Sequence, residues 1–187
     1  MQIMSAMTLF DGYTPLSRTL DEFVDGEGGL RPVPAQVARR LSELGADELS
    51  LRQNLVDVAF LQGGVTFSVY ADNEGTERIF PFDLVPRVIS ANEWQRVEEG
   101  LVQRVRALNA FLTDAYGPGR IFEERVVPRT LLERCSGYVP RCAGLDVPGC
   151  VPITIAGIDL LRDEDGEFLV LEDNMRVPSG VSYVLEN

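Results

Sequence analysis

Apolar side chains recur every three to four residues along three stretches of the sequence, and this spacing predicts three helices. The first helix is expected to begin near Pro34 and to end at Gly45. The second covers residues 46–62 and stops at Gly63-Gly64, because glycine readily takes the left-handed conformation that ends a helix. The third is the clearest, with six apolar residues at helical spacing: Trp94, Val97, Leu101, Val105, Leu108 and Leu112.

The start of the third helix carries a capping pattern. Asn92 can act as the N-cap, and Gln95 stands three residues later, which is the offset of a capping box. This helix is expected to end at residues 117–119, which are glycine and proline, and a short helix is expected over residues 128–134.

Residues rich in β-branched and aromatic side chains predict strands in two places. Residues 65–70 form the first strand, residues 72–75 have turn chemistry, and residues 78–82 return, with Pro81 at a strand end or edge. Near the end of the chain, two apolar runs flank residues 165–166 and predict a second strand pair. Helices combined with such pairs indicate an α/β (α+β) chain with a mixed or antiparallel sheet.

The N-terminal segment differs from the remainder. Residues 1–33 are expected to be irregular, because Gly26, Gly28, Gly29 and Pro32 interrupt any periodic pattern. Residues 34–187 are expected to belong to one domain.

The charge is strongly negative, with 17 Lys+Arg against 29 Asp+Glu and a net charge of −12. A negative surface repels phosphate backbones and anionic lipid, so neither nucleic acid nor a membrane is expected as a partner. All 17 cations are Arg, and the chain contains no His. Catalysis would therefore depend on carboxylates, Arg, backbone amides or a bound cation. No signal peptide is apparent, so a cytoplasmic location is expected.

The pair Asp165-Gly166 is favoured in a two-residue hairpin turn, because both central positions need positive φ. Such a turn places Asp159 directly opposite Glu172. Asn174 then lies on the same face as Glu172, because side chains alternate along a strand.

Two directly opposed carboxylates lie roughly 4.5–5.5 Å apart at Cβ and repel each other. A shared proton, a nearby Arg or a divalent cation could offset this repulsion. Two carboxylates and an amide oxygen suit Mg²⁺ or Mn²⁺, so Asp159, Glu172 and Asn174 are the candidate metal ligands. Asp173 falls on the opposite face and is excluded.

Two observations bear on this interpretation in opposite directions. Accidental acidic pairs are common in an acidic protein, so a solvated acidic hairpin is the alternative. However, apolar neighbours predict a buried strand pair, where unpaired charge is costly: Ile153, Ile155, Leu161, Phe168 and Val170.

The order Asp, Asp-Gly, Leu-Glu-x-Asn resembles the metal-binding strands of ATP-grasp ligases, such as D-alanine–D-alanine ligase and glutathione synthetase. The longer phrases are similar to the circularly permuted type 2 ATP-grasp proteins, relatives of glutathionylspermidine synthase. Those phrases are Gly64-Val-Thr-Phe67, Glu77-Arg-Ile-Phe-Pro-Phe-Asp83-Leu-Val-Pro-Arg87, Ala156-Gly-Ile-Asp159-Leu and Leu171-Glu-Asp-Asn174-x-Arg176-Val-Pro-Ser-Gly180-Val-Ser-Tyr183.

This resemblance implies an ATP-dependent ligase that joins a small carboxylate to an amine or peptide through an acyl phosphate. It implies that Asp159, Glu172 and Asn174 hold Mg²⁺, and that Glu172 and Asn174 thereby bind the ATP phosphates. It also implies that Arg176, Ser179 and Ser182 bind a substrate carboxylate, with Arg176 as a catalytic residue. For these last three residues an exposed turn is the alternative.

The resemblance further implies that residues 34–187 are the N-terminal portion of a circularly permuted ATP-grasp fold, truncated at the C-terminal end. The missing half of the protein would be its partner, because ATP-grasp enzymes clamp the nucleotide with Lys and this chain has none. Some relatives also place an Arg where this chain has Gly157. The isolated chain is therefore expected to lack a complete ATP site.

Three alternatives stay open from the sequence. The chain could be a non-catalytic binding or scaffold fragment of a truncated ligase. A two-carboxylate hydrolase is less favoured, because directly opposed carboxylates leave less than the ~5–5.5 Å used by retaining glycosidases. Arg78 and Arg87 could bind an anionic substrate, although an ion pair with Asp83 or Glu77 is the more ordinary interpretation.

Overall fold

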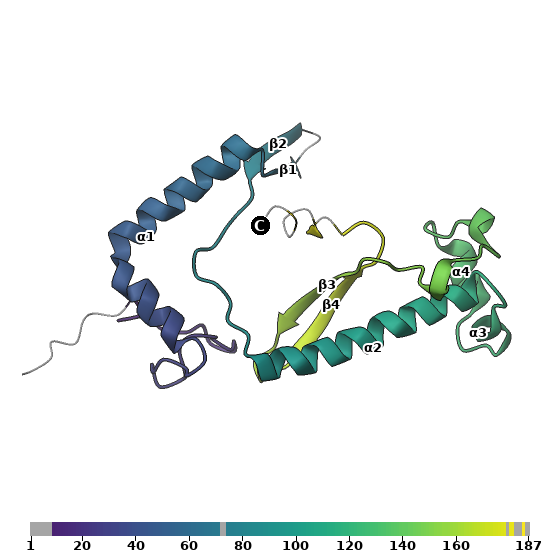
Figure 1. The fold of residues 1–187 in the computed structure, drawn as a ribbon, viewed down its shortest axis with the longest axis horizontal. Coiled ribbons are helices and arrows are strands. Elements are labelled where there is room, and N and C mark those ends of the chain that lie inside the picture. Colours follow the sequence, from purple (N-terminus) through teal and green to yellow (C-terminus); the bar gives the residue numbers. More distant parts are fainter. Residues whose placement is uncertain (1–8, 72–73, 179, 182–184, 186–187) are drawn as a thin grey trace, which may run out of the picture. The chain divides into compact units, whose positions relative to one another are not determined.

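The computed structural model describes residues 9–71, 74–178, 180–181 and 185, without the side chains of residues 67–71 and 74–77. The chain divides into two compact units, Met1–Ser90 and Ala91–Asn187 (Figure 1). Helices are combined with two-stranded antiparallel sheets in the described part of the chain, as the fold class predicted. No helix among these residues is long and apolar enough to cross a membrane.

Helix α1 (Ala35–Gly63) contains both helices expected in the first unit. Gly45 interrupts it with φ 78° and ψ 163°, values outside the helical region, so the predicted break is confirmed. The helix ends at Gly64, whose φ of 67° lies in the left-handed region that favours glycine. The predicted stop at the glycine pair is therefore also confirmed.

Strands β1 (Thr66–Ala71) and β2 (Glu74–Ile79) pair antiparallel in one continuous register. The register runs from Thr66↔Ile79 to Ala71↔Glu74. The predicted first strand is confirmed, but the returning strand begins at Glu74 rather than at residue 78. It ends before Pro81, which cannot donate a ladder hydrogen bond.

The described residues before α1 form turns and one isolated bridge, Val24↔Leu30. A small core of Phe23, Val24 and Ala38 joins this segment to the start of α1. Asp21 organises the segment by accepting hydrogen bonds from the Tyr13 hydroxyl (2.7 Å) and from the backbone N–H groups of Phe23 and Val24. Burial opposes ionisation of Asp21, but these hydrogen bonds outweigh it and lower its pKa.

Helix α2 (Ala91–Ala115) begins the second unit. It starts one residue before Asn92, and the Gln95 side chain donates to Glu99 at 3.1 Å, so the predicted capping box is wrong. The Gln95 side chain instead interacts with Glu99, its i,i+4 neighbour on the same helix face.

Two short helices and two 3₁₀ turns follow α2. Helix α3 spans Arg120–Glu123, α4 spans Arg129–Arg134 as expected, and the 3₁₀ turns η1 and η2 span Pro140–Cys142 and Pro148–Cys150. Strands β3 (Gly157–Arg162) and β4 (Phe168–Asn174) then form an antiparallel hairpin that runs alongside α2 (Figure 1).

Candidate metal site on the β3–β4 hairpin

The turn between β3 and β4 has three residues rather than two. Asp163 and Glu167 close it, with the Asp163 N–H donating to the Glu167 carbonyl at 3.0 Å. The Asp163 carboxylate also accepts from the N–H groups of Asp165 and Glu167, and Gly166 has φ 89°. The predicted two-residue turn at Asp165-Gly166 is therefore wrong, because Asp163 organises a longer loop in which only Gly166 needs positive φ.

A β-bulge follows the turn. Pairing runs from Arg162↔Phe168 to Leu160↔Val170 and then continues as Asp159↔Glu172, so that Leu171 is an extra residue in β4. The longer turn shifts the pairing by one residue relative to the predicted register, and the extra residue at Leu171 shifts it back. Asp159 consequently meets Glu172 as predicted, although the route to this pairing was not the predicted one.

The candidate ligands share one side of the hairpin, the side that faces away from α2, which we call the open face. Asp159 and Glu172 are exposed, and Gly157 pairs with Asn174 at the end of the ladder. The Asn174 side chain donates from Nδ2 to Asp159 Oδ2 at 3.5 Å. Within the described part of the chain, neither Asp159 nor Glu172 has an ion-pair partner. Two like charges therefore face each other without a protein cation to offset their repulsion.

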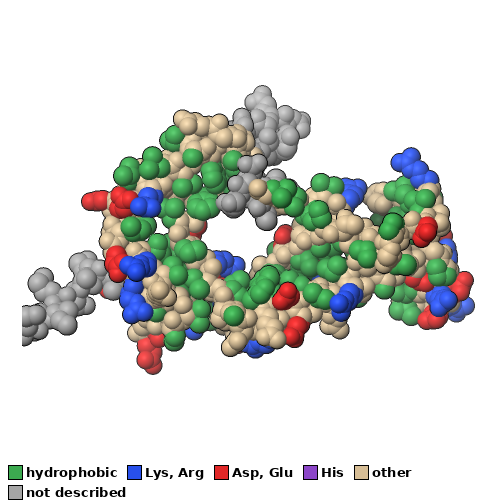
Figure 2. All heavy atoms as spheres, in the orientation of Figure 1, with side chains coloured by type: hydrophobic (Ala, Val, Ile, Leu, Met, Phe, Trp, Pro, Cys, Tyr) green, Lys and Arg blue, Asp and Glu red, His purple; other side chains and the backbone are tan. Residues whose placement is uncertain are grey.

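The prediction that this face is buried is wrong. Leu161 is 40% exposed, Leu169 48% and Leu171 70%. In the view of Figure 2, hydrophobic side chains lie at the surface in the region of the hairpin. Of the apolar residues that suggested burial, Ile153 before the strand is buried, Phe168 and Val170 are half-buried on the α2 side, and Ile155 and Leu161 are exposed.

The opposite face of the hairpin is tied to α2 by two ion pairs. Asp173 receives Arg104 in a two-pronged contact, with Nε 2.8 Å from Oδ1 and Nη2 2.5 Å from Oδ2. This hydrogen bonding lowers the pKa of Asp173 and raises that of Arg104. Arg162, 8% exposed, binds Glu93 at 2.7 Å and stacks over Phe168. The exclusion of Asp173 from the acidic face is therefore confirmed.

The chain folds back over the end of the hairpin after β4. A Cβ at Gly157 would lie 2.6 Å from Cβ of Pro178 and 3.6 Å from Cβ of Asn174, so only glycine fits beneath this crossing. Arg176 is exposed in the bend that leads to the crossing. Ser179 and Ser182 lie outside the described residues.

The first unit contains an ion pair where the sequence left two interpretations open. Arg87 binds Glu22 through both Nε and Nη2, at 3.0 Å and 2.5 Å, and this hydrogen bonding raises its pKa. Arg87 is therefore in an ion pair, but the prediction that its partner is Asp83 or Glu77 is wrong. Asp83 instead accepts the Val85 N–H at 2.8 Å. Arg78 is exposed.

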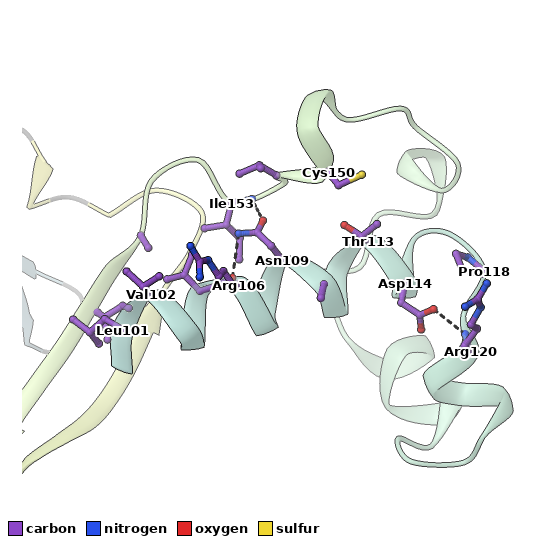
Figure 3. Close-up of a pocket in the computed structure, with 15 residues that line it drawn as sticks. Leu101, Val102, Arg106, Asn109, Thr113, Asp114, Pro118, Arg120, Cys150 and Ile153 are labelled. Carbon is purple, nitrogen blue, oxygen red and sulfur yellow. Dashed lines mark hydrogen bonds between the residues drawn. The ribbon is translucent and has the colours of Figure 1, made fainter. Parts of the chain in front are cut away.

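A hollow of about 1100 Å³ lies on the α2 side of the second unit (Figure 3). At its centre the buried Asn109 accepts the Ile153 N–H at 2.8 Å and donates to the Val105 carbonyl at 3.1 Å. This contact fixes the segment that leads into β3. Asp159, Glu172 and Asn174 do not line the hollow, because they face the other side of the hairpin.

Two important residues were missed by sequence reasoning, Arg104 and Asn109. Both lie on α2, where their spacing relative to the apolar residues gives no sign of a distant partner. No group of three or more acidic or cysteine side chains that could hold a metal occurs among the residues described. The candidate site differs from such a group because it combines two carboxylates with an amide.

Comparison with known proteins gives the relatives of this sequence. Residues 86–187 match the family model described as circularly permuted ATP-grasp type 2. An uncharacterised protein of Synechocystis sp. is 46% identical over 167 residues, which is 89% of this chain and 35% of that protein. A protein of Mycobacterium leprae, also uncharacterised, is 45% identical over 96% of this chain and 32% of its own length.

A third relative carries a functional name. A protein of Frankia alni, provisionally named glutamate–cysteine ligase 2-3, is 42% identical over 183 residues, which is 97% of this chain and 20% of that protein. The chain thus spans about a third or less of the length of these relatives.

Proposed function

Because this chain belongs to the circularly permuted ATP-grasp type 2 family, we propose that it is part of an ATP-dependent carboxylate–amine ligase. In this proposal the β3–β4 hairpin provides the divalent-cation site of the ATP-binding region. The provisional name of the Frankia alni relative is consistent with this reaction class, since a glutamate–cysteine ligase joins a carboxylate to an amine.

The observation that carries the proposal is the pairing of Asp159 with Glu172, beside Asn174, whose Nδ2 lies 3.5 Å from Asp159 Oδ2 and whose other amide atom is the oxygen Oδ1. These groups supply hard oxygen donors, which Mg²⁺ and Mn²⁺ prefer. Asp159 and Glu172 are exposed and Asn174 is half-buried, which leaves room for phosphate and water, ligands that Mg²⁺ usually retains. The donor set therefore fits a cation that is shared with the ATP phosphates.

The bound cation would neutralise charge on the phosphates during transfer. In the proposed reaction, a substrate carboxylate oxygen attacks the γ-phosphorus of ATP, and ADP leaves. The amine then attacks the acyl carbon, and phosphate leaves as the amide bond forms. Asp159, Glu172 and Asn174 would fix the position of the phosphates by holding their cation.

We assign substrate binding to the segment after β4. Arg176 would hold the substrate carboxylate through its planar guanidinium group, which matches a carboxylate in two-pronged contacts. Ser179 and Ser182 would add hydroxyl donors. The fold-back over Gly157 supports this assignment, because it leads the chain from Arg176 across the end of the hairpin that carries Asn174.

The remaining phosphate contacts are proposed to come from other parts of the natural protein. The chain has no Lys, and Gly157 stands where some ATP-grasp proteins have Arg. Relatives of this family are about three times as long as the matched segment. We therefore expect additional polypeptide to complete the nucleotide clamp.

Titration of Mn²⁺ into the 187-residue chain, followed by the electron paramagnetic resonance signal of free Mn²⁺, tests the metal site. Glu172→Gln should weaken binding at least tenfold, because it removes one of only two carboxylate donors. Glu164→Gln is the matched control, since Glu164 is exposed in the turn of the same hairpin. Equal affinity in the two variants would refute the assignment.

The ligase reaction itself is tested in the natural protein that carries this sequence. ATP and Mg²⁺ are supplied with amino-acid, polyamine or peptide acceptors, and ADP release is measured. Release that depends on both substrates and is lost in Glu172→Gln supports the ligase. Absence of any nucleotide or metal binding would favour the scaffold alternative.

A further inference from the structure

The bulge at Leu171 decides which side chains of β4 face Asp159. With the bulge, Glu172 lies opposite Asp159, and Asp173 lies opposite Ile158 on the α2 side. If the pairing between Leu160 and Val170 continued without an extra residue, Asp159 would meet Leu171 and Ile158 would meet Glu172. A one-residue slip moves every side chain to the other face.

Arg104 therefore has two neighbouring acids that could reach it. In the structure it binds Asp173 with both arms of its guanidinium group. In the slipped register Glu172 would take the place opposite Ile158 and present its carboxylate to α2. Whichever of Asp173 and Glu172 binds Arg104 therefore lies on the α2 side and is absent from the open face.

We propose that Arg104 is a positioning residue that selects the bulged register of β4. By holding Asp173 on the α2 side, it keeps Glu172 and Asn174 on the open face beside Asp159. The importance of that arrangement rests on the proposed metal site, whereas the choice of register is a property of the hairpin itself.

A second ion pair provides the matched comparison. Arg162 and Glu93 also join the hairpin to α2, at 2.7 Å. Arg162 pairs with Phe168, on the turn side of the bulge, so its position is the same in both registers. The Arg162–Glu93 contact can therefore dock the hairpin on α2, but it cannot choose between the registers.

The expected effects of single substitutions follow an unusual order. Asp173→Ala should be the most harmful, because Arg104 then recruits Glu172 and draws it away from Asp159. Arg104→Gln should be intermediate, because it removes the preference for the bulged register but leaves no Arg to draw Glu172 towards α2. The double variant Arg104→Gln/Asp173→Ala should bind Mn²⁺ better than Asp173→Ala alone, since nothing then draws Glu172 towards α2.

The register is measured by nuclear magnetic resonance, as cross-strand contacts between backbone protons in the 187-residue chain. The wild-type chain should show Asp159 beside Glu172. Asp173→Ala should replace this contact by one between Asp159 and Leu171, and Glu93→Gln should keep the wild-type contact. Persistence of the Asp159–Glu172 contact in Asp173→Ala would overturn the proposal. If Asp173→Ala does not fold, the same measurement is made on Arg104→Gln. Both the Asp159–Glu172 and the Asp159–Leu171 contact are expected there, and the Asp159–Glu172 contact alone would overturn the proposal.

Mn²⁺ affinity gives the second readout. We expect at least a tenfold loss in Asp173→Ala, recovery of at least threefold in the double variant, and less than a twofold change in Glu93→Gln. A double variant that binds no better than Asp173→Ala would contradict the positioning role. If the wild-type chain itself does not bind Mn²⁺, the proposed metal site fails, while the backbone contacts still test the register.

Discussion

The two hairpins of this chain reach their registers in different ways. Strands β1 and β2 pair without interruption from Thr66↔Ile79 to Ala71↔Glu74. Strands β3 and β4 are joined by a three-residue turn, and they pair with one extra residue at Leu171. Over the described residues, the β1–β2 ladder contains no bulge.

The irregular hairpin depends on contacts made outside its own ladder. Arg104 holds Asp173, Asn109 fixes the approach to β3, and the crossing at Pro178 covers Gly157. Bulges are frequent beside functional residues, because they redirect side chains that a regular ladder would place elsewhere. The candidate chemistry thus lies where the ladder is irregular, and in our proposal Arg104 on the neighbouring helix determines the register there.

Among the contacts that support the β3–β4 hairpin, the crossing at Gly157 should give the largest effect on stability when it is changed, in Gly157→Ala. The added Cβ would lie 2.6 Å from Cβ of Pro178, so the crossing segment must move. We expect a loss of about 3 kcal/mol in the free energy of unfolding, at the upper end for overpacked sites. Urea denaturation measures it. Gly100→Ala within α2 meets no atom within 4 Å and should instead stabilise the chain by about 0.5–1 kcal/mol.

Asn109→Leu should cost less, about 2 kcal/mol, because it leaves the N–H of the buried Ile153 without its acceptor. Thermal and urea unfolding measure the loss. Amide hydrogen exchange should show faster exchange at Ile153 and in β3, and unchanged exchange in β1 and β2. Equal acceleration in both hairpins would contradict the role of Asn109 as a local anchor.

Gly166→Ala should cost about 1.5 kcal/mol, because a residue with a Cβ is strained at φ 89°. The effect should be confined to the turn, since Asp163 still closes the loop. Gly26→Ala is a suitable comparison, because Gly26 meets no atom within 4 Å and does not have positive φ. Differential scanning calorimetry of the two variants distinguishes backbone strain from a general loss of glycine.

Deletion of Leu171 should have the smallest effect and is the sharpest test of the comparison. It removes the extra residue, so β3 and β4 would pair as continuously as β1 and β2 while Asp159 still meets Glu172. Because Leu171 is 70% exposed, we expect a change within about 1 kcal/mol. Mn²⁺ affinity should stay within threefold and should no longer depend on Asp173. Loss of the Asp159–Glu172 contact in this variant would show that the bulge has another role.

The sequence by itself determined the features that depend on nearby residues. Helical spacing and glycine stops predicted both arms of α1, and β-branched residues predicted β1. The predicted pairing of Asp159 with Glu172 is present, but it was derived from a two-residue turn that the structure does not have. Helix periodicity and strand content are local properties, so a single sequence carries enough information for them.

Only the tertiary structure decided the features that depend on residues far apart in the chain. Arg104 and Asp173 are separated by 69 positions, and so are Arg162 and Glu93. Asp163 closes a three-residue turn in place of the predicted two-residue turn at Asp165-Gly166, and the extra residue at Leu171 restores the pairing of Asp159 with Glu172. Periodicity cannot reveal which of two adjacent acids an Arg on another helix will bind, because that choice depends on packing, and here packing sets the face of the hairpin on which Glu172 lies.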